Sequence, residues 1–218
     1  DDVRISNPPS NPELLEELGK RLAKGGYDFK QLVRDICNSR TYQRTVQSNE
    51  SNKADSTNFA KASIRRVRAE VLLDIISQVT NTQNKFRGLP NGASAVEIVD
   101  GRTSTFFLTT FGRATRDTVC SCEVALEPNL SQALHLLNGD TVNSKCVQGG
   151  FVKKALEAKK TPSQVIDELY LSCLARKPTA TEKEKLMAFV GEKDRSDTDV
   201  LNDLFWAILN SKEFIFNH

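Results

Sequence analysis

The residues best suited to hold a metal ion gather in one short stretch of the chain. Cys120, Cys122 and Glu123 are followed by His135 and Cys146, so three of the five cysteines and one of the two histidines fall close together. Three thiolates and an imidazole form a tetrahedral ligand set that suits Zn²⁺ or Cu⁺. The spacing is not that of a standard zinc motif. Two alternatives therefore stay open, a disulfide from the Cys-x-Cys pair to Cys146 and plain thiols with a histidine satisfied on a helix.

A second set of polar residues has the composition of an anion or sugar site. Arg66, Glu70 and Asp74 are spaced by four, which predicts one face of a helix, while Arg113 and Arg116 lie in FGRATRD just before the cysteines. If the two groups meet in space, arginines and carboxylates would bind an anionic ligand or a carbohydrate, or place an acid beside a base. The alternative is a structural ion network on a partly buried helix.

Nucleophilic catalysis finds few candidate residues in this sequence. There is no G-x-S-x-G turn, and His135 and His218 are the only histidines that could serve a serine or cysteine as a base. Whether the chain is an enzyme stays open. Our leading hypothesis is a packing or docking platform for neighbouring domains, without a cofactor of its own. A metal- or redox-dependent site around Cys120, Cys122, His135 and Cys146, with Zn or Cu, is the alternative.

Composition limits the classes of partner. The chain has 218 residues, of which 39% are hydrophobic, and its 30 basic and 28 acidic side chains leave a net charge of +2. That balance argues against nucleic acid as a partner, and no apolar run reaches the roughly 18 residues that span a bilayer. The acidic pair at the start leads directly into a capped helix, so we expect this chain to be a fragment of a larger multidomain protein.

Apolar residues recur at helical spacing along most of the chain, which predicts an all-α fold. We expect an orthogonal bundle of helical hairpins in one domain, residues 1–218, with at least seven helices. Capping signals mark several helix starts: Ser10 with Glu13, Asp28 with Gln31, Thr161 before Pro162, Thr179 with Glu182, and Asp140 after a Leu-Leu-Asn-Gly ending. Weak alternation in 93–99 predicts a short strand or β-hairpin near 93–110.

One helix ending occurs twice. The segments LVRDICNSRTY at 32–42 and LFWAILNSKEF at 204–214 both run from an apolar helix into Asn-Ser, a basic residue and an aromatic ring. Asparagine tolerates the left-handed backbone of a helix end, and the basic side chain complements the helix dipole. We therefore predict two helix terminations in which Tyr42 and Phe214 fold back onto the helix.

Several phrases of the chain carry a family resemblance. They are RISNPPSNPELL, ICNSRTYQ, RRVRAEVLLDIISQVT, FFLTTFGRATRDTVCSCE, SQALHLLNGDTVN, ELYLSCLARKPTATEKE and WAILNSKEFIFNH. In this order they resemble the C-terminal domain, without known function, of large exported planctomycete proteins that often carry a cytochrome-c-like domain. The resemblance implies an extracytoplasmic location. It also implies that the partners are upstream domains of the same chain, an envelope protein or a polysaccharide. The chain has no Cys-x-x-Cys-His, so a c-type haem would belong to another domain.

Overall fold

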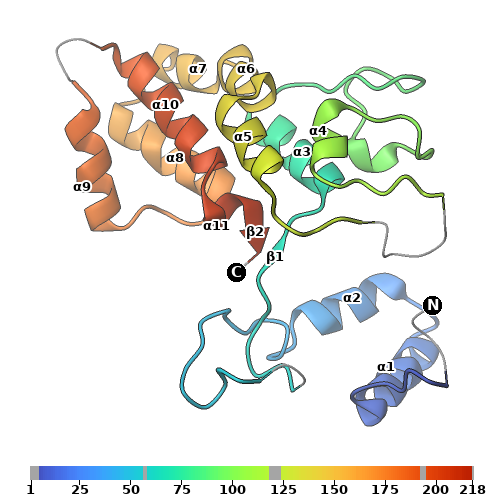
Figure 1. Ribbon diagram of the computed structural model, residues 1–218. Helices are drawn as coiled ribbons and strands as arrows, with labels where there is room; N and C mark the ends of the chain where they lie inside the picture. The colour runs from blue at the N-terminus through green and yellow to red at the C-terminus, as the bar shows by residue number, and fades with distance from the viewer. Residues whose placement is uncertain (1–4, 56–57, 118–123, 192–194, 218) are drawn as a thin grey trace. The chain divides into compact units, whose positions relative to one another are not determined.

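The chain is mostly helical, as the sequence predicts. The structure, a computed structural model, describes residues 5–55, 58–117, 124–191 and 195–217. Its contacts group into two compact units, residues 1–64 and residues 65–217 (Figure 1). The all-α fold is confirmed, and the expectation that residues 1–218 act as one domain stays a prediction. None of the described helices is long and apolar enough to span a membrane.

The N-terminal unit contains a helical hairpin. Its helices are α1 (Pro12–Lys24) and α2 (Phe29–Cys37), and the turn between them includes Gly26 and Tyr27 with positive φ angles. Asp28 caps α2 as expected, because its carboxylate accepts a hydrogen bond from the Gln31 N–H at 3.0 Å. The capping box expected from Ser10 and Glu13 is wrong. Asn11 is the N-cap of α1, and its side chain makes no capping bond.

The C-terminal unit holds the rest of the regular structure. Its elements are β1 (Arg65–Arg66), α3 (Ala69–Val79), the 3₁₀-helix η1 (Ala95–Glu97), α4 (Phe106–Thr110), α5 (Leu130–Asn138), α6 (Asp140–Gln148), α7 (Phe151–Glu157), α8 (Pro162–Leu174), α9 (Ala180–Phe189), α10 (Asp197–Leu209), α11 (Lys212–Ile215) and β2 (Phe216–Asn217). The strand expected near 93–110 is wrong, because η1 and α4 occupy that stretch. Gly139, not Asp140, is the N-cap of α6.

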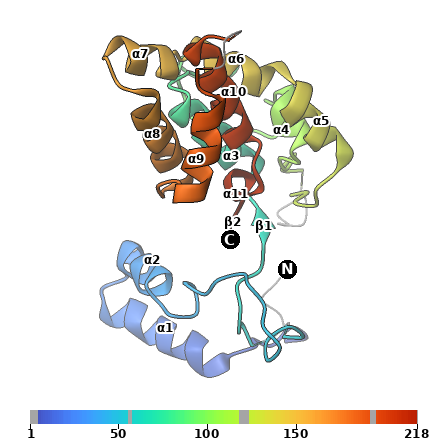
Figure 2. The same ribbon diagram turned by 90° about the vertical axis from the view of Figure 1, so that its left-hand side faces the viewer.

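Three helices supply much of the hydrophobic core of this unit. Their fully or nearly fully buried side chains are Leu72, Leu73 and Ile76 of α3, Val165, Ile166 and Leu169 of α8, and Leu201, Phe205 and Leu209 of α10. Helix α10 packs against α6, α7 and α8, whereas α3 packs against η1, α4 and α6. Figures 1 and 2 both show α10 running along α8. The apolar faces of these three helices therefore belong to one continuous core.

A short antiparallel ladder joins the two ends of the C-terminal unit. Arg65 pairs with Asn217 and Arg66 with Phe216, and the Val67 N–H donates to the Ile215 carbonyl at 2.9 Å. Neither strand carries an alternating apolar pattern long enough to predict it from sequence. The ladder fixes Arg66 at the entrance to α3.

The end of α3 is held by a close backbone approach and a half-buried amine. A Cβ on Gly149 would lie 1.5 Å from the Thr80 carbonyl oxygen, so only glycine fits where α6 ends beside α3. Lys145 Nζ donates to the side-chain oxygens of Ser77, Thr82 and Asn84 at 2.9–3.1 Å. Burial lowers the pKa of this amine. These contacts tie α6 to the end of α3.

The two copies of the repeated helix ending share one hydrogen bond. Ser39 Oγ accepts from the Tyr42 N–H, and Ser211 Oγ accepts from the Phe214 N–H, each at 3.2 Å. The preceding asparagines lie in the right-handed region, so the left-handed geometry expected from them is wrong. Phe214 is buried as predicted, but Tyr42 is 64% exposed and does not close its helix. The motif is a serine-initiated turn.

Arg176 connects the start of α9 to α11. Its guanidinium forms two hydrogen bonds to each carboxylate of Glu182 and Glu213, at 2.6–2.9 Å, and lies over the Tyr170 ring. Thr179 and Glu182 also form the capping box predicted for α9. The hydrogen bonds from Arg176 lower the pKa of Glu182 from 4.5 to about 2. The carboxylate is thus stabilised in its charged form.

We predict that Glu182→Gln lowers the free energy of unfolding at pH 7 by about 1 kcal/mol, a modest value because the pair is partly exposed. The folded-state pKa is depressed, so this stabilisation is present above pH 4.5 and is lost as the pH falls toward 2. Urea unfolding at pH 7 and pH 3 measures both effects. Glu184→Gln, on an exposed residue of the same helix, is the control and should change neither value.

Candidate functional site

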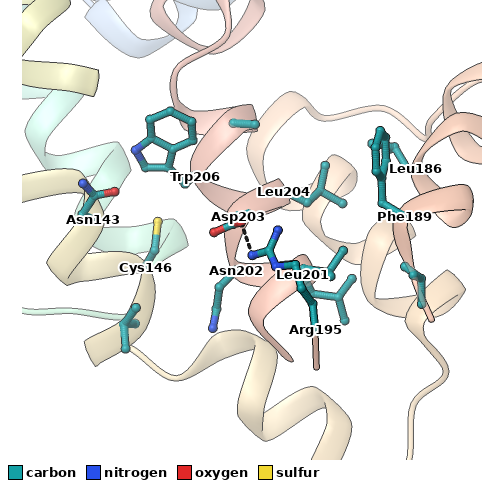
Figure 3. A pocket seen from close by; sticks show the side chains of 14 residues that line it. Asn143, Cys146, Leu186, Phe189, Arg195, Leu201, Asn202, Asp203, Leu204 and Trp206 are labelled. Carbon is teal, nitrogen blue, oxygen red and sulfur yellow. Dashed lines mark hydrogen bonds and ion pairs between the residues drawn. The ribbon is translucent and has the colours of Figure 1, made fainter. Parts of the chain in front are cut away.

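A mostly apolar groove lies between α6, α9 and α10. Its volume is about 640 Å³, which is within the range of ligand and peptide pockets. The residues that line it are Asn143, Cys146, Val147, Leu186, Phe189, Val190, Arg195, Val200, Leu201, Asn202, Asp203, Leu204, Trp206 and Ala207. Figure 3 shows these side chains approaching the groove from all three helices.

The helix contacts explain why the groove stays open. Helix α9 packs against α8 and has no buried residue, so Leu186 and Phe189 are left to line the groove. Phe189 is 56% exposed and Val147, on α6, is 66% exposed. Exposed apolar side chains that border a groove are typical of a surface that binds another molecule.

The polar groups of the groove suit recognition better than catalysis. Arg195 and Asp203 form an ion pair, drawn in Figure 3 between Trp206 on one side and Phe189 on the other. The Trp206 indole N–H is buried and has no acceptor among the described residues. The lining contains no histidine and no pair of carboxylates for general acid and base chemistry.

Of the four predicted metal ligands, two lie within the described residues. Cys146 is a free thiol, 3% exposed at the base of the groove. Burial and the nearby Cys173 thiol raise the pKa of Cys146 to about 12, and burial raises that of Cys173 to about 11. A thiol with so high a pKa is a poor nucleophile at neutral pH.

His135 packs among aromatic rings. The ring centroids of Phe106, Phe107 and Phe111 lie 5.1–6.0 Å from that of the imidazole. His135 Nε2 is 3.2 Å from the Thr141 hydroxyl. These contacts are typical of a core histidine.

Cys120, Cys122 and Glu123 lie outside the described residues. Within the residues that the structure describes, no three His, Cys, Asp or Glu side chains are placed to hold a metal ion. The metal set and the disulfide alternative therefore stay predictions.

Arg66 binds backbone carbonyls. Its guanidinium is buried, donates to the carbonyls of Val67, Phe111 and Ala125 at 2.7–3.0 Å, and lies against the Phe111 ring. Burial lowers its pKa. Arg66 lies on β1 and α3 begins only at Ala69, so the expectation that it shares a helical face with Glu70 and Asp74 is wrong.

Arg113 also binds backbone carbonyls. It donates to the carbonyls of Ile98, Asp100 and Thr103 at 2.8–3.2 Å, and its Nε lies 3.5 Å from a Glu70 carboxylate oxygen. The arginines of FGRATRD were expected to lie near Glu70, and the ion pair between Arg113 and Glu70 is the contact that brings them together.

The two remaining members of the predicted anion site also bind backbone groups. Asp74 accepts hydrogen bonds from the N–H groups of Ala95 and Val96, at 2.6 and 3.2 Å, and so holds the start of η1. Arg116 donates to the Val99 carbonyl at 2.6 Å. Asp74 and the Arg113–Glu70 pair tie α3 to the segment 95–116. Arg66, on β1, and Arg116 instead bind carbonyls of that segment. An anion or sugar site there stays a prediction.

The groove was not predicted as a site. The spacing of Leu186 and Phe189, and that of Leu201 and Leu204, predicts apolar helix faces but not a groove. The sequence signal that could have indicated the groove was Trp206, the single tryptophan, which follows the buried Phe205 of α10.

We predict that Arg113→Lys lowers the free energy of unfolding by about 2–4 kcal/mol, because one ammonium cannot replace three carbonyl contacts in a buried site. Chemical denaturation of the two proteins measures the difference. Arg87→Lys, at an exposed loop position, serves as the matched control and should be neutral. Equal stability of Arg113→Lys and the unaltered chain would contradict the structural role of Arg113.

We predict slow labelling of two native thiols in a variant carrying Cys120→Ser and Cys122→Ser. At pH 8, Cys146 and Cys173 should react with a thiol reagent at least roughly a hundredfold more slowly than a reference thiol, and Cys146 more slowly than Cys173, because their raised pKa values leave little thiolate. Time-resolved labelling with mass spectrometry assigns each rate. In denaturant the difference should vanish. Fast native labelling of Cys146 would contradict its burial.

Comparisons with known proteins point to one family. The family described as "Protein of unknown function (DUF1553)", or PSD1, matches residues 1–190. No curated protein and no solved structure matches the chain. The match includes the α1–α2 hairpin and continues through α9.

Proposed function

The chain belongs to the DUF1553 family, and from this premise we propose that it is a docking module of an exported protein. The groove between α6, α9 and α10 would receive an apolar segment of a neighbouring domain. The single observation that carries this proposal is the open, apolar lining of the groove, with Phe189 and Val147 exposed at its edge.

The chemistry of the groove favours a peptide segment as occupant. Leu186, Leu204 and Phe189 offer apolar contacts, and the buried Trp206 N–H lacks an acceptor that a peptide carbonyl would supply. The Arg195–Asp203 pair places both charges beside a mostly apolar lining, where the polar backbone of a peptide would meet them. An amphipathic helix or extended segment from a sibling domain meets these requirements.

The cellular location of the module and the identity of its neighbouring domains belong to the same proposal. The ordered phrases that resemble planctomycete exported proteins support an extracytoplasmic protein whose other domains include a cytochrome-c-like one. Its partners would be those domains, or an envelope protein or polysaccharide. The chemistry described above favours the protein partners, because the groove is lined mainly by aliphatic and aromatic side chains.

Site-specific photocrosslinking tests the proposal. A benzophenone amino acid replaces Phe189 in the parent protein, and the control carries it at Leu171, an exposed leucine of α8 outside the groove. We expect position 189 alone to crosslink to a sibling domain or to one envelope protein. Equal crosslinking from both positions, or none from position 189, would contradict docking at the groove.

A substitution pair provides the matched binding test with the partner that crosslinking identifies. Phe189→Glu should weaken binding roughly tenfold or more, because it places a charge on the apolar edge of the groove. Leu171→Glu should leave the affinity unchanged. Trp206 is the only tryptophan of the chain, so a shift of its fluorescence in a complex with a tryptophan-free partner peptide reports occupancy of the groove directly.

A further inference from the structure

A smaller pocket, of about 230 Å³, lies among α5, β1 and the end of α10. Three buried apolar side chains line it, Phe111, Leu136 and Ile215, each at most 7% exposed. Ala133 and Leu137 of α5 also line the pocket and are exposed, so it opens to solvent beside α5. The volume lies below the roughly 300–1,000 Å³ of drug-sized sites, and it therefore suits a small compound.

Arg66 contributes an unpaired hydrogen-bond donor to this lining. The residue is 5% exposed, and its two terminal nitrogens donate to the carbonyls of Val67, Phe111 and Ala125. Its third nitrogen, Nε, is buried and has no acceptor among the described residues. A buried N–H without an acceptor costs free energy, so an acceptor supplied by a ligand would be favoured.

Asn210, at the end of α10, contributes an unpaired acceptor to the same lining. Its Nδ2 donates to the Trp206 carbonyl at 2.8 Å, and this bond identifies the other terminal atom as the oxygen, because the reverse assignment would place two oxygens together. That oxygen, Oδ1, is buried and has no donor among the described residues. Asn38, the counterpart of Asn210 in the repeated helix ending, is exposed. The unpaired acceptor is therefore specific to this pocket.

We propose that the pocket binds a small neutral compound that carries a carboxamide on a short apolar body. The carboxamide oxygen accepts from Arg66 Nε–H and the carboxamide N–H donates to Asn210 Oδ1, while the buried apolar side chains surround the body. A carboxylate would satisfy Arg66 but would set a negative oxygen against Asn210 Oδ1, and a ketone would leave Asn210 unpaired. The pocket shares no lining residue with the groove between α6, α9 and α10, so this inference does not depend on docking there.

Three probes of similar shape test the class of ligand on the whole chain, namely benzamide, benzoate and acetophenone. In ¹H–¹⁵N NMR spectra we expect benzamide to shift the signals of Ala133 and of the Asn210 side chain saturably, with a dissociation constant of about millimolar order. Benzoate and acetophenone should bind at least roughly tenfold more weakly, because each loses one of the two hydrogen bonds. Tighter binding of benzoate, equal binding of all three probes, or no saturable shift at the solubility limit of benzamide would overturn the proposal.

A capped glutamine distinguishes a free compound from the side chain of a protein partner, which carries the same carboxamide. We expect benzamide to bind more tightly than capped glutamine, because its ring contacts the apolar side chains of the pocket. Tighter binding of capped glutamine would overturn the assignment to a free compound.

Two pairs of variants locate the binding. Ala133→Leu fills the opening of the pocket from an exposed position and should abolish the benzamide shifts, whereas Ser131→Leu, on the same helix but outside the lining, should leave them unchanged. Asn210→Ala should weaken benzamide binding roughly tenfold without affecting acetophenone, and Asn38→Ala should affect neither probe. If Asn210→Ala unfolds the chain, the α5 pair still decides. Unchanged benzamide binding in Ala133→Leu would contradict the site.

Discussion

The C-terminal unit depends on finding hydrogen-bond donors for buried backbone carbonyls that no strand or helix pairs. Much of the segment between α3 and α5 has no regular structure, yet its carbonyls at Ile98 and Phe111 accept buried hydrogen bonds. A buried carbonyl needs a donor. Arg66 and Arg113 supply several donors each on a planar group, so two side chains satisfy carbonyls from four parts of the chain.

This constraint also decides what the arginines can do. A guanidinium that donates to three carbonyls has few donors left for a ligand, and its buried charge is stabilised by carbonyl dipoles more than by carboxylates. Glu70 contributes one longer contact to Arg113, and Asp74 is occupied by the N–H groups at the start of η1. The groove, in contrast, lies where helices α6, α9 and α10 leave apolar side chains uncovered. The groove and the buried arginine contacts are therefore located in different parts of the fold.

Local rules predicted the helices well and their assembly poorly. The caps at Asp28, Thr161 and Thr179 form as the sequence indicates, because a capping bond involves residues three positions apart. Arg66 was misplaced because the β1–β2 ladder joins residues 150 positions apart, and no periodicity signals so short a strand. The groove was missed for a related reason. An apolar stripe shows which face of a helix avoids water, but the contacts of α9 decide how much of that face is covered.

The β1–β2 ladder has a topological consequence. Because Arg65 lies opposite Asn217, the polypeptide enters and leaves residues 65–217 at the same point. A unit of this kind can be inserted into a loop of another protein with little disturbance of the host, and its own ends could be joined and reopened elsewhere by circular permutation. Tension along the chain would open the ladder one residue pair at a time, before the helices bear any load.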